Sequence, residues 1–220
     1  MTAGQGGGLP GVCFVTDRRA TKDRPILEVA TAAIQGGAGL IQVREKDLPA
    51  RDLLRLVLEL RAAAHAIGAV RLRIVVNDRL DVALAAKATG VHLPATGLPV
   101  AAVRRKVGKR FLIGRSVHGL AEAREAEKAG ADYLLFGPIF PTPSKAGLGE
   151  PQGTAALAKL VQSVHLPVWA IGGIDPENAA QLRGTGIAGV AAIAAIAAAA
   201  DPAAVVRALR AALAPPGTTG

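Results

Sequence analysis

The sequence alternates between two kinds of segment from end to end, and this alternation constrains the fold more than any other feature. Short apolar or β-branched runs predict strands, and longer runs rich in alanine, leucine and charged residues at helical spacing lie between them. Strands are predicted at residues 12–16, 40–44, 73–77, 90–93, 111–116, 133–137, 167–172 and 186–193. Eight strand-then-helix units in 220 residues predict an α/β protein with a single-domain (β/α)8 TIM barrel rather than an open doubly wound sheet.

The segments between the strands carry helix signals. Residues 50–67 place an apolar stripe at helical spacing, formed by Leu53, Leu56, Val57 and Leu60. Residues 120–130 end on a glycine, which suits a helix C-terminus. An Asp-Pro pair predicts a capped helix start at Asp175 and another at Asp201. No internal linker divides the chain, so the prediction is a barrel over residues 11–213 with flexible tails at 1–10 and 214–220.

Composition excludes several classes of function. The net charge of +9 suits an anionic partner, but four Phe, one Tyr and one Trp leave few rings on which bases could stack, so no nucleic-acid partner is predicted. The longest apolar tract, residues 187–200, is too short to span a bilayer. A lone cysteine, Cys13, rules out a disulfide framework, and the N-terminus has no signal-peptide pattern. A cytoplasmic protein without a membrane partner is therefore expected.

Barrel enzymes place their sites at the carboxyl ends of the strands, so polar residues there matter most. After the second predicted strand, the period of two directs Gln42, Arg44 and Lys46 toward the barrel mouth and Glu45 to the opposite face. Two cations in such a mouth need counter-charge, which either an internal ion pair or an anionic ligand can supply.

Further polar residues follow the third and fifth strands. Asn77 and Asp78 offer oxygen atoms suited to Mg²⁺, although an Asp at this position can equally cap the next helix. Ser116 and His118 follow the fifth strand and are expected at the rim. The four histidines show no metal-cluster spacing, so zinc is not predicted.

The loop after the sixth strand begins with three prolines and then becomes rich in glycine. The prolines reduce the cost of ordering Thr142, Ser144 and Lys145 around a ligand, and hydroxyl and ammonium groups bind phosphate. The glycines suit a mobile lid. After the seventh strand, Gly172 and Gly173 precede a predicted helix, where backbone amides can approach an anion. This face is therefore predicted to bind phosphorylated small molecules.

The ordered motifs "FVTDR", "IQVREK", "VNDRLDVALA", "GVHL", "GRSVH", "FGPIFPTPSK" and "AIGGI" resemble, along nearly the whole chain, the thiamine-phosphate synthase family. The resemblance implies a TIM barrel that joins hydroxymethylpyrimidine diphosphate to a thiazole phosphate and releases pyrophosphate with Mg²⁺. It also implies ionisation to a pyrimidinylmethyl cation, which the thiazole nitrogen captures. Self-association into a homo-oligomer is compatible with this resemblance.

The resemblance implies a role for each matching residue. The diphosphate would be bound by Gln42, Arg44, Lys46, Ser116 and Lys145. The pyrimidine and Mg²⁺ would be held by Asn77 and Asp78, with Asp78 as the metal ligand. The thiazole phosphate would be held by Thr142, Ser144 and backbone at Gly173 and Ile193.

Two positions depart from the family pattern. Gly97 stands where a second Mg²⁺ carboxylate is usual, and Ala194 where a phosphate-binding serine is usual. The motifs "GVHLPATG" and "GRSVH" also resemble the paralogous thiazole tautomerases, but Pro138 occupies the position of their proton-transfer histidine. A tautomerase-like paralogue and a catalytically silent phosphate-ligand binder are the alternatives to the synthase.

Overall fold

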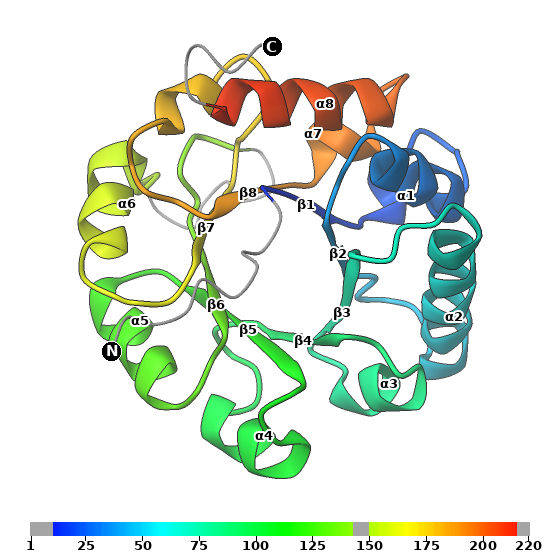
Figure 1. Cartoon of the computed structure of the whole chain (residues 1–220), viewed down its shortest axis with the longest axis horizontal. Helices are drawn as coiled ribbons and strands as arrows, with labels where there is room; N and C mark the ends of the chain where they lie inside the picture. The colour runs from blue at the N-terminus through cyan, green and yellow to red at the C-terminus, as the bar shows by residue number, and fades with distance from the viewer. Residues whose placement is uncertain (1–10, 143–149, 215–220) are drawn as a thin grey trace.

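The computed structural model describes residues 11–142 and 150–214. Its centre is a closed barrel in which each strand pairs in parallel with the next and β8 pairs with β1 (Figure 1). The strands are β1 Val12–Val15, β2 Leu40–Val43, β3 Arg73–Asn77, β4 Gly90–Leu93, β5 Leu112–Val117, β6 Tyr133–Phe136, β7 Val168–Ile171 and β8 Gly189–Ala192. The predicted (β/α)8 TIM barrel is confirmed.

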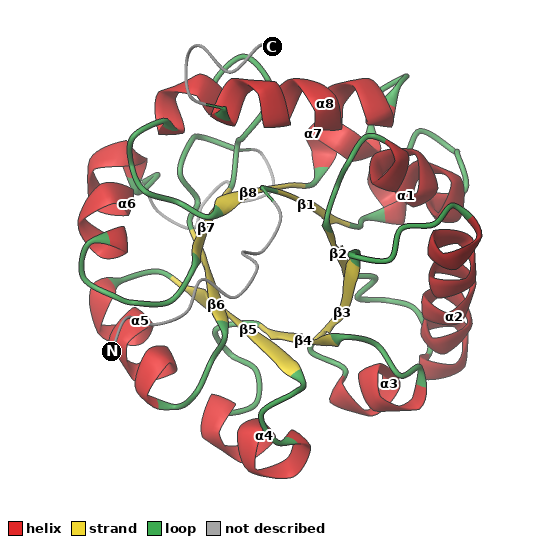
Figure 2. Ribbon diagram, in the orientation of Figure 1, coloured by secondary structure: helices red, strands yellow, loops and turns green. Residues whose placement is uncertain are grey.

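Helices form a ring outside the barrel (Figure 2). They are α1 Ile26–Gln35, α2 Ala50–Ala66, α3 Leu80–Ala85, α4 Val100–Val107, α5 Leu120–Lys128, α6 Gly153–Val161, α7 Ala194–Ala197 and α8 Pro202–Leu213, with short 3-10 helices η1 Arg18–Ala20 and η3 Ala179–Leu182. Residues 1–10 and 215–220, most of the two predicted tails, lie outside the described residues, so the division into tails and barrel stays a prediction. Among the described helices, none has the length and apolar character that crossing a membrane requires.

The two Asp-Pro pairs have different outcomes. Asp201 caps α8 as predicted, because its side chain accepts from the N–H of Ala204 and Pro202 opens the helix. At Asp175 the prediction of a capped α-helix is wrong. The Asp175 carboxylate accepts from the N–H groups of Glu177 and Asn178, and the chain then forms only the 3-10 helix η3. These local bonds satisfy the backbone within a turn and so compete with a regular helix.

The last strand is shorter than its apolar run. The run predicts a strand over 186–193, whereas β8 begins at Gly189. Gly184 and Gly186 have φ angles of 76° and 80°, a left-handed conformation that a strand does not adopt. A turn therefore precedes β8, and in the sequence only these glycines indicate it.

Apolar side chains fill the inside of the barrel and the layer between barrel and helices. The inner cluster consists of Cys13, Val15, Leu40, Val75, Tyr133, Leu135, Trp169 and Ala191. Cys13 is fully buried there, as its place in an apolar strand predicts, and burial raises the pKa of its thiol. The inside of the barrel is thus a packed core rather than a pore.

Candidate active site

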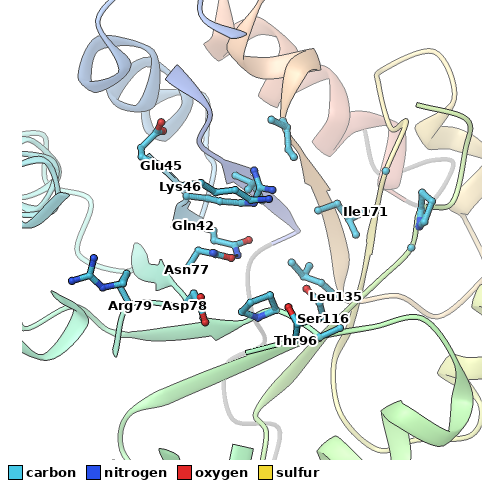
Figure 3. Close-up of a pocket in the computed structure, with 18 of the residues that line it drawn as sticks. Gln42, Glu45, Lys46, Asn77, Asp78, Arg79, Thr96, Ser116, Leu135 and Ile171 are labelled. Carbon is cyan, nitrogen blue, oxygen red and sulfur yellow. Dashed lines mark hydrogen bonds between the residues drawn. The ribbon is translucent and has the colours of Figure 1, made fainter. Parts of the chain in front are cut away.

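A cavity of about 610 Å³ lies at the carboxyl ends of the strands. Figure 3 shows Gln42, Lys46, Asn77 and Asp78 on one side of it, with Ser116 and Leu135 across from them. The cavity lining contains seven of the predicted site residues, which are Gln42, Arg44, Lys46, Asn77, Asp78, Ser116 and Ile193. Residues as far apart in the sequence as Gln42 and Ile193 therefore meet in one space.

Arg44 and Lys46 bring positive charge to this cavity. Within the described part of the chain, neither takes part in an ion pair with a carboxylate. The backbone N–H of Arg44 donates to Thr16 Oγ1 at 2.9 Å, which ties the end of β2 to the end of β1. Of the two sources of counter-charge, this arrangement favours an anionic ligand.

Glu45 corrects one prediction from strand parity. It is 6 % exposed and contributes to the cavity lining rather than lying wholly on the opposite face. The regular strand ends at Val43, so the alternation of faces does not extend to residue 45. Glu45 Oε2 accepts from the backbone N–H of Arg18 at 3.1 Å, at the edge of the cavity in Figure 3.

Asp47, the next acidic residue after Glu45, links the loop after β2 to the loop after β1. Asp47 accepts from Arg18 Nη2 at 2.6 Å and from Arg19 Nη2 at 2.7 Å. The hydrogen bond from Arg18 is the main reason that the pKa of Asp47 lies well below its usual range. Lys46 stands between Glu45 and Asp47, so both of its neighbours are held to the loop after β1.

Gln42 and Asn77 form a polar pair on neighbouring strands. Gln42 Nε2 donates to Asn77 Oδ1 at 3.1 Å, and Gln42 is only 2 % exposed. The buried Gln42 Oε1 has no donor among the described residues. A buried acceptor without a partner is costly, so this amide oxygen is available to accept an N–H from outside the described residues.

Asp78 follows Asn77 in a left-handed conformation, with φ at 63°. Its backbone N–H donates to His92 O at 2.8 Å, which places the residue between β3 and β4. The alternative that Asp78 caps the next helix is wrong, because the N-cap of α3 is Arg79 and the Asp78 side chain makes no hydrogen bond to that helix in the described chain. Gly97, from the loop after β4, lies directly beside the Asp78 carboxylate.

The donor set fits a magnesium ion that relies on its substrate. Among the described residues, no group of three or more His, Cys, Asp or Glu could hold a metal. Mg²⁺ commonly binds through one or two carboxylates together with water and phosphate oxygens. Asp78 alone can supply that single carboxylate, whereas a zinc cage would need more ligands.

Ser116 connects the cavity to the barrel interior. His92 Nε2 lies 2.8 Å from Ser116 Oγ, and His92 Nδ1 lies 3.1 Å from the Tyr133 hydroxyl. Complete burial, with smaller contributions from Arg115 and Arg44, lowers the pKa of His92 to about 3. The imidazole is therefore neutral at physiological pH.

The predicted phosphate loops are described only in part. Ser144 and Lys145 lie outside the described residues. Thr142 and Gly173 are described but do not belong to the cavity lining, whereas Gly172 does. The expected helix start after Gly173 is also absent in the described chain, since a turn and η3 follow it.

The loop after β4 contributes Pro94, Ala95 and Thr96 to the lining, which the sequence reasoning missed. Their only signal was the unusual "PATG" segment. Arg79 was missed as well. It also lines the cavity, but its guanidinium is bound by Asp81 at 2.6 and 2.9 Å.

Comparisons with known proteins show the family to which the chain is similar. The family model for thiamine monophosphate synthase matches residues 12–196. A thiamine-phosphate synthase of Roseiflexus sp. (strain RS-1) is 44 % identical over 209 residues, covering 95 % of this chain and 86 % of that protein. The thiamine-phosphate synthase of Methanoculleus marisnigri is 44 % identical over 200 residues, covering 91 % of this chain and 93 % of that one.

A solved structure gives the same result. Thiamine phosphate pyrophosphorylase from Pyrococcus furiosus superposes with a TM-score of 0.83 at 37 % identity, covering 93 % of this chain and 96 % of that one. Family model, curated relatives and solved structure all span the strands whose ends form the cavity. The chain therefore belongs to the thiamine monophosphate synthase family.

Proposed function

We propose that this protein is a thiamine-phosphate synthase, which joins hydroxymethylpyrimidine diphosphate to a thiazole phosphate and releases pyrophosphate. The observation that carries the proposal is the cavity in which Arg44 and Lys46 meet Gln42, Asn77 and Asp78 without an ion-pair partner for either cation in the described chain. An anionic substrate supplies the counter-charge that this lining requires.

The lining suits a reaction in which negative charge builds up on a leaving diphosphate. Arg44 and Lys46 would bind the diphosphate oxygens and stabilise the charge as the bond to the pyrimidinylmethyl carbon breaks. Ser116 would donate from the opposite wall, and Lys145, outside the described residues, is proposed to join them. The thiazole nitrogen would then capture the pyrimidinylmethyl cation.

The amide pair of Gln42 and Asn77 would recognise the pyrimidine, so the proposed role of Gln42 differs from the diphosphate contact that the family resemblance implies. Gln42 Oε1 is buried and has no donor in the described chain, so it can accept from an amino group of the ring. Asn77 holds the Gln42 amide in that orientation through its own Oδ1. Thr142, Ser144, Gly173 and Ile193 remain the proposed contacts of the thiazole phosphate.

Mg²⁺ is the proposed cofactor, with Asp78 as its ligand from the protein. When bound, the ion would neutralise part of the charge on the diphosphate. Asp78 is positioned for this by its neighbours, because its backbone is fixed to His92 and its carboxylate faces Gly97. The buried free thiol of Cys13 is compatible with a reducing compartment, and we place the enzyme in the cytoplasm.

The test is formation of thiamine phosphate from the two substrates and Mg²⁺, detected as its fluorescent oxidation product. We expect turnover by the wild type, a loss of at least about a hundredfold in Arg44→Ala, and unchanged turnover in Arg51→Ala, which alters an exposed arginine on α2. Equal activity in Arg44→Ala and wild type would refute the proposed diphosphate site. Binding of both substrates without product would instead indicate the silent binder.

The tautomerase alternative has less support from the cavity. Pro138 lines the cavity at the position of the tautomerase histidine and offers no group that can move a proton. Isomerisation of a thiazole carboxylate phosphate by the purified protein, without thiamine phosphate formation, would reverse this ranking.

A further inference from the structure

Ser116, His92 and Tyr133 form a chain of hydrogen bonds from the cavity wall into the barrel. Ser116 Oγ lies 2.8 Å from His92 Nε2, and the Tyr133 hydroxyl lies 3.1 Å from His92 Nδ1. His92 is 1 % exposed and Tyr133 is fully buried, whereas Ser116 lines the cavity. Of these three hydrogen-bonded residues, a ligand can therefore reach only Ser116.

Strand register brings the two rings together. His92 pairs with Gly114 on β5, and Gly114 pairs with Tyr133 on β6. A Cβ atom on Gly114 would lie 2.1 Å from the Tyr133 ring and 2.5 Å from His92 Nδ1. The rings can therefore meet across β5 only because the strand between them has no side chain at that position.

A neutral imidazole carries one N–H, so this chain can have only one of two directions. In the first, the Tyr133 hydroxyl donates to Nδ1, and Nε2–H donates to Ser116 Oγ. In the second, Nδ1–H donates to the Tyr133 oxygen, and the Ser116 hydroxyl donates to Nε2. The Ser116 hydroxyl hydrogen points away from the imidazole in the first direction and toward it in the second.

Tyr133 decides between them. Its hydroxyl has no other hydrogen-bond partner among the described residues. The second direction would leave a buried hydroxyl hydrogen without an acceptor, which disfavours that tautomer by about tenfold or more. The first direction satisfies the phenol, and it leaves the Ser116 hydrogen free of the imidazole.

We propose that Tyr133 and His92 are positioning residues that fix the direction of the Ser116 hydroxyl, so that its hydrogen points into the cavity and donates to a diphosphate oxygen. The inference rests on the proposed function for the identity of the anion. In the opposite direction, Ser116 would present only lone pairs to that anion. The buried pair therefore converts a serine that could either donate or accept into an obligatory donor.

Nuclear magnetic resonance of the full chain with nitrogen-15-labelled histidine tests the direction without any turnover. Two-bond proton–nitrogen correlations distinguish the tautomers, and the signal missing in His92→Gln identifies His92 among the four histidines. We expect the Nε2–H form in the wild type, and a tautomer mixture or the Nδ1–H form in Tyr133→Phe. An Nδ1–H form in the wild type overturns the inference.

Calorimetric binding of inorganic pyrophosphate with Mg²⁺ tests the consequence. We expect Ser116→Ala to weaken binding by about tenfold, and Tyr133→Phe to weaken it by about twofold to tenfold, in proportion to the fraction of the Nδ1–H form. The double variant should be no weaker than Ser116→Ala, because both substitutions remove the same donor. Additive losses, or an unchanged affinity in either single variant, overturn the inference. Tyr133→Phe keeps the ring that packs the core, and a single cooperative melting transition confirms that the variant folds.

These measurements separate the inference from the function on which it rests. A wild type that shows the Nε2–H form and non-additive losses of pyrophosphate affinity, but makes no thiamine phosphate, refutes the synthase proposal and leaves the hydroxyl direction intact.

Discussion

A Cβ atom added to Gly97 would lie 2.9 Å from Oδ1 of Asp78. The loop after β4 thus brings its backbone directly against the one carboxylate proposed to bind Mg²⁺. A carboxylate at position 97 would lie beside that of Asp78, as the usual family pattern implies. Because position 97 lies so close to Asp78, a substitution there can test directly whether a second carboxylate would help to bind Mg²⁺.

Gly97→Asp is expected to lower the Mg²⁺ concentration for half-maximal activity several-fold, because a second carboxylate would share the ion. Gly97→Ala is the matched control, since it introduces the same Cβ crowding against Asp78 and Pro94 without a charge. Titration of activity with Mg²⁺ compares the two variants. A similar shift in both, or in neither, would mean that residue 97 does not reach the metal.

Asp78→Asn is expected to reduce kcat by at least about tenfold and to raise the Mg²⁺ requirement, because it removes the negative charge. The backbone should tolerate the change, since asparagine adopts a left-handed φ, here 63°, more readily than most residues. Steady-state kinetics and a melting curve separate the two effects. A large fall in melting temperature would show that Asp78 acts mainly in folding.

Thr16→Val is expected to lower the free energy of unfolding by about 1–3 kcal/mol, because the N–H of Arg44 loses its acceptor in a site where Thr16 is 1 % exposed. It should also raise the KM for the diphosphate substrate through misplacement of Arg44. Urea unfolding and initial rates measure the two changes. Thr16→Ser keeps the hydroxyl, so it should lose less stability and retain the wild-type KM.

Acid is expected to destabilise the wild type partly through His92. Its pKa is about 3 in the folded protein and near 6.5 when unfolded, so the unfolded state binds the extra proton first. The stability that depends on neutral His92 is fully present above about pH 6.5, and it is lost progressively as the pH falls toward 3. The slope is at most about 1.4 kcal/mol per pH unit.

Urea unfolding between pH 7 and 4 checks this expectation, with His92→Gln as the reference because glutamine carries no charge at either pH. The wild type should lose more unfolding free energy than the variant across this range. Parallel pH dependences would show that His92 takes up its proton equally well in the folded protein.

Local pattern was sufficient to predict the barrel and much of its site. Alternation of strand and helix signals predicts a closed eight-stranded barrel, and the closed sheet confirms it. The pleat predicts that Gln42, Arg44 and Lys46 point toward the barrel mouth, and all three line the cavity there. The assignments of individual residues to substrate atoms remain predictions.

The predictions that are wrong concern residues that follow the end of a regular strand. Glu45 follows the last residue of β2, so a two-residue period no longer describes where its side chain lies. Asp175 is followed by bonds between side chains and backbone that favour a turn over a helix. Neither outcome follows from a periodic pattern, because each depends on local contacts that propensity does not specify.

The element order, the closed barrel and the end at which the polar residues gather follow from the amino-acid pattern alone, because they depend on periodicities of two and 3.6 residues. The partners of individual residues emerge only in the folded protein: Gly97 lies against Asp78, Thr16 binds the backbone of Arg44, and the phenol of Tyr133 reaches His92 across Gly114. Those contacts join residues from different strands or from the segments that follow them. They depend on the register between strands and on the course of the loops, which the spacing of residues within a single strand cannot specify.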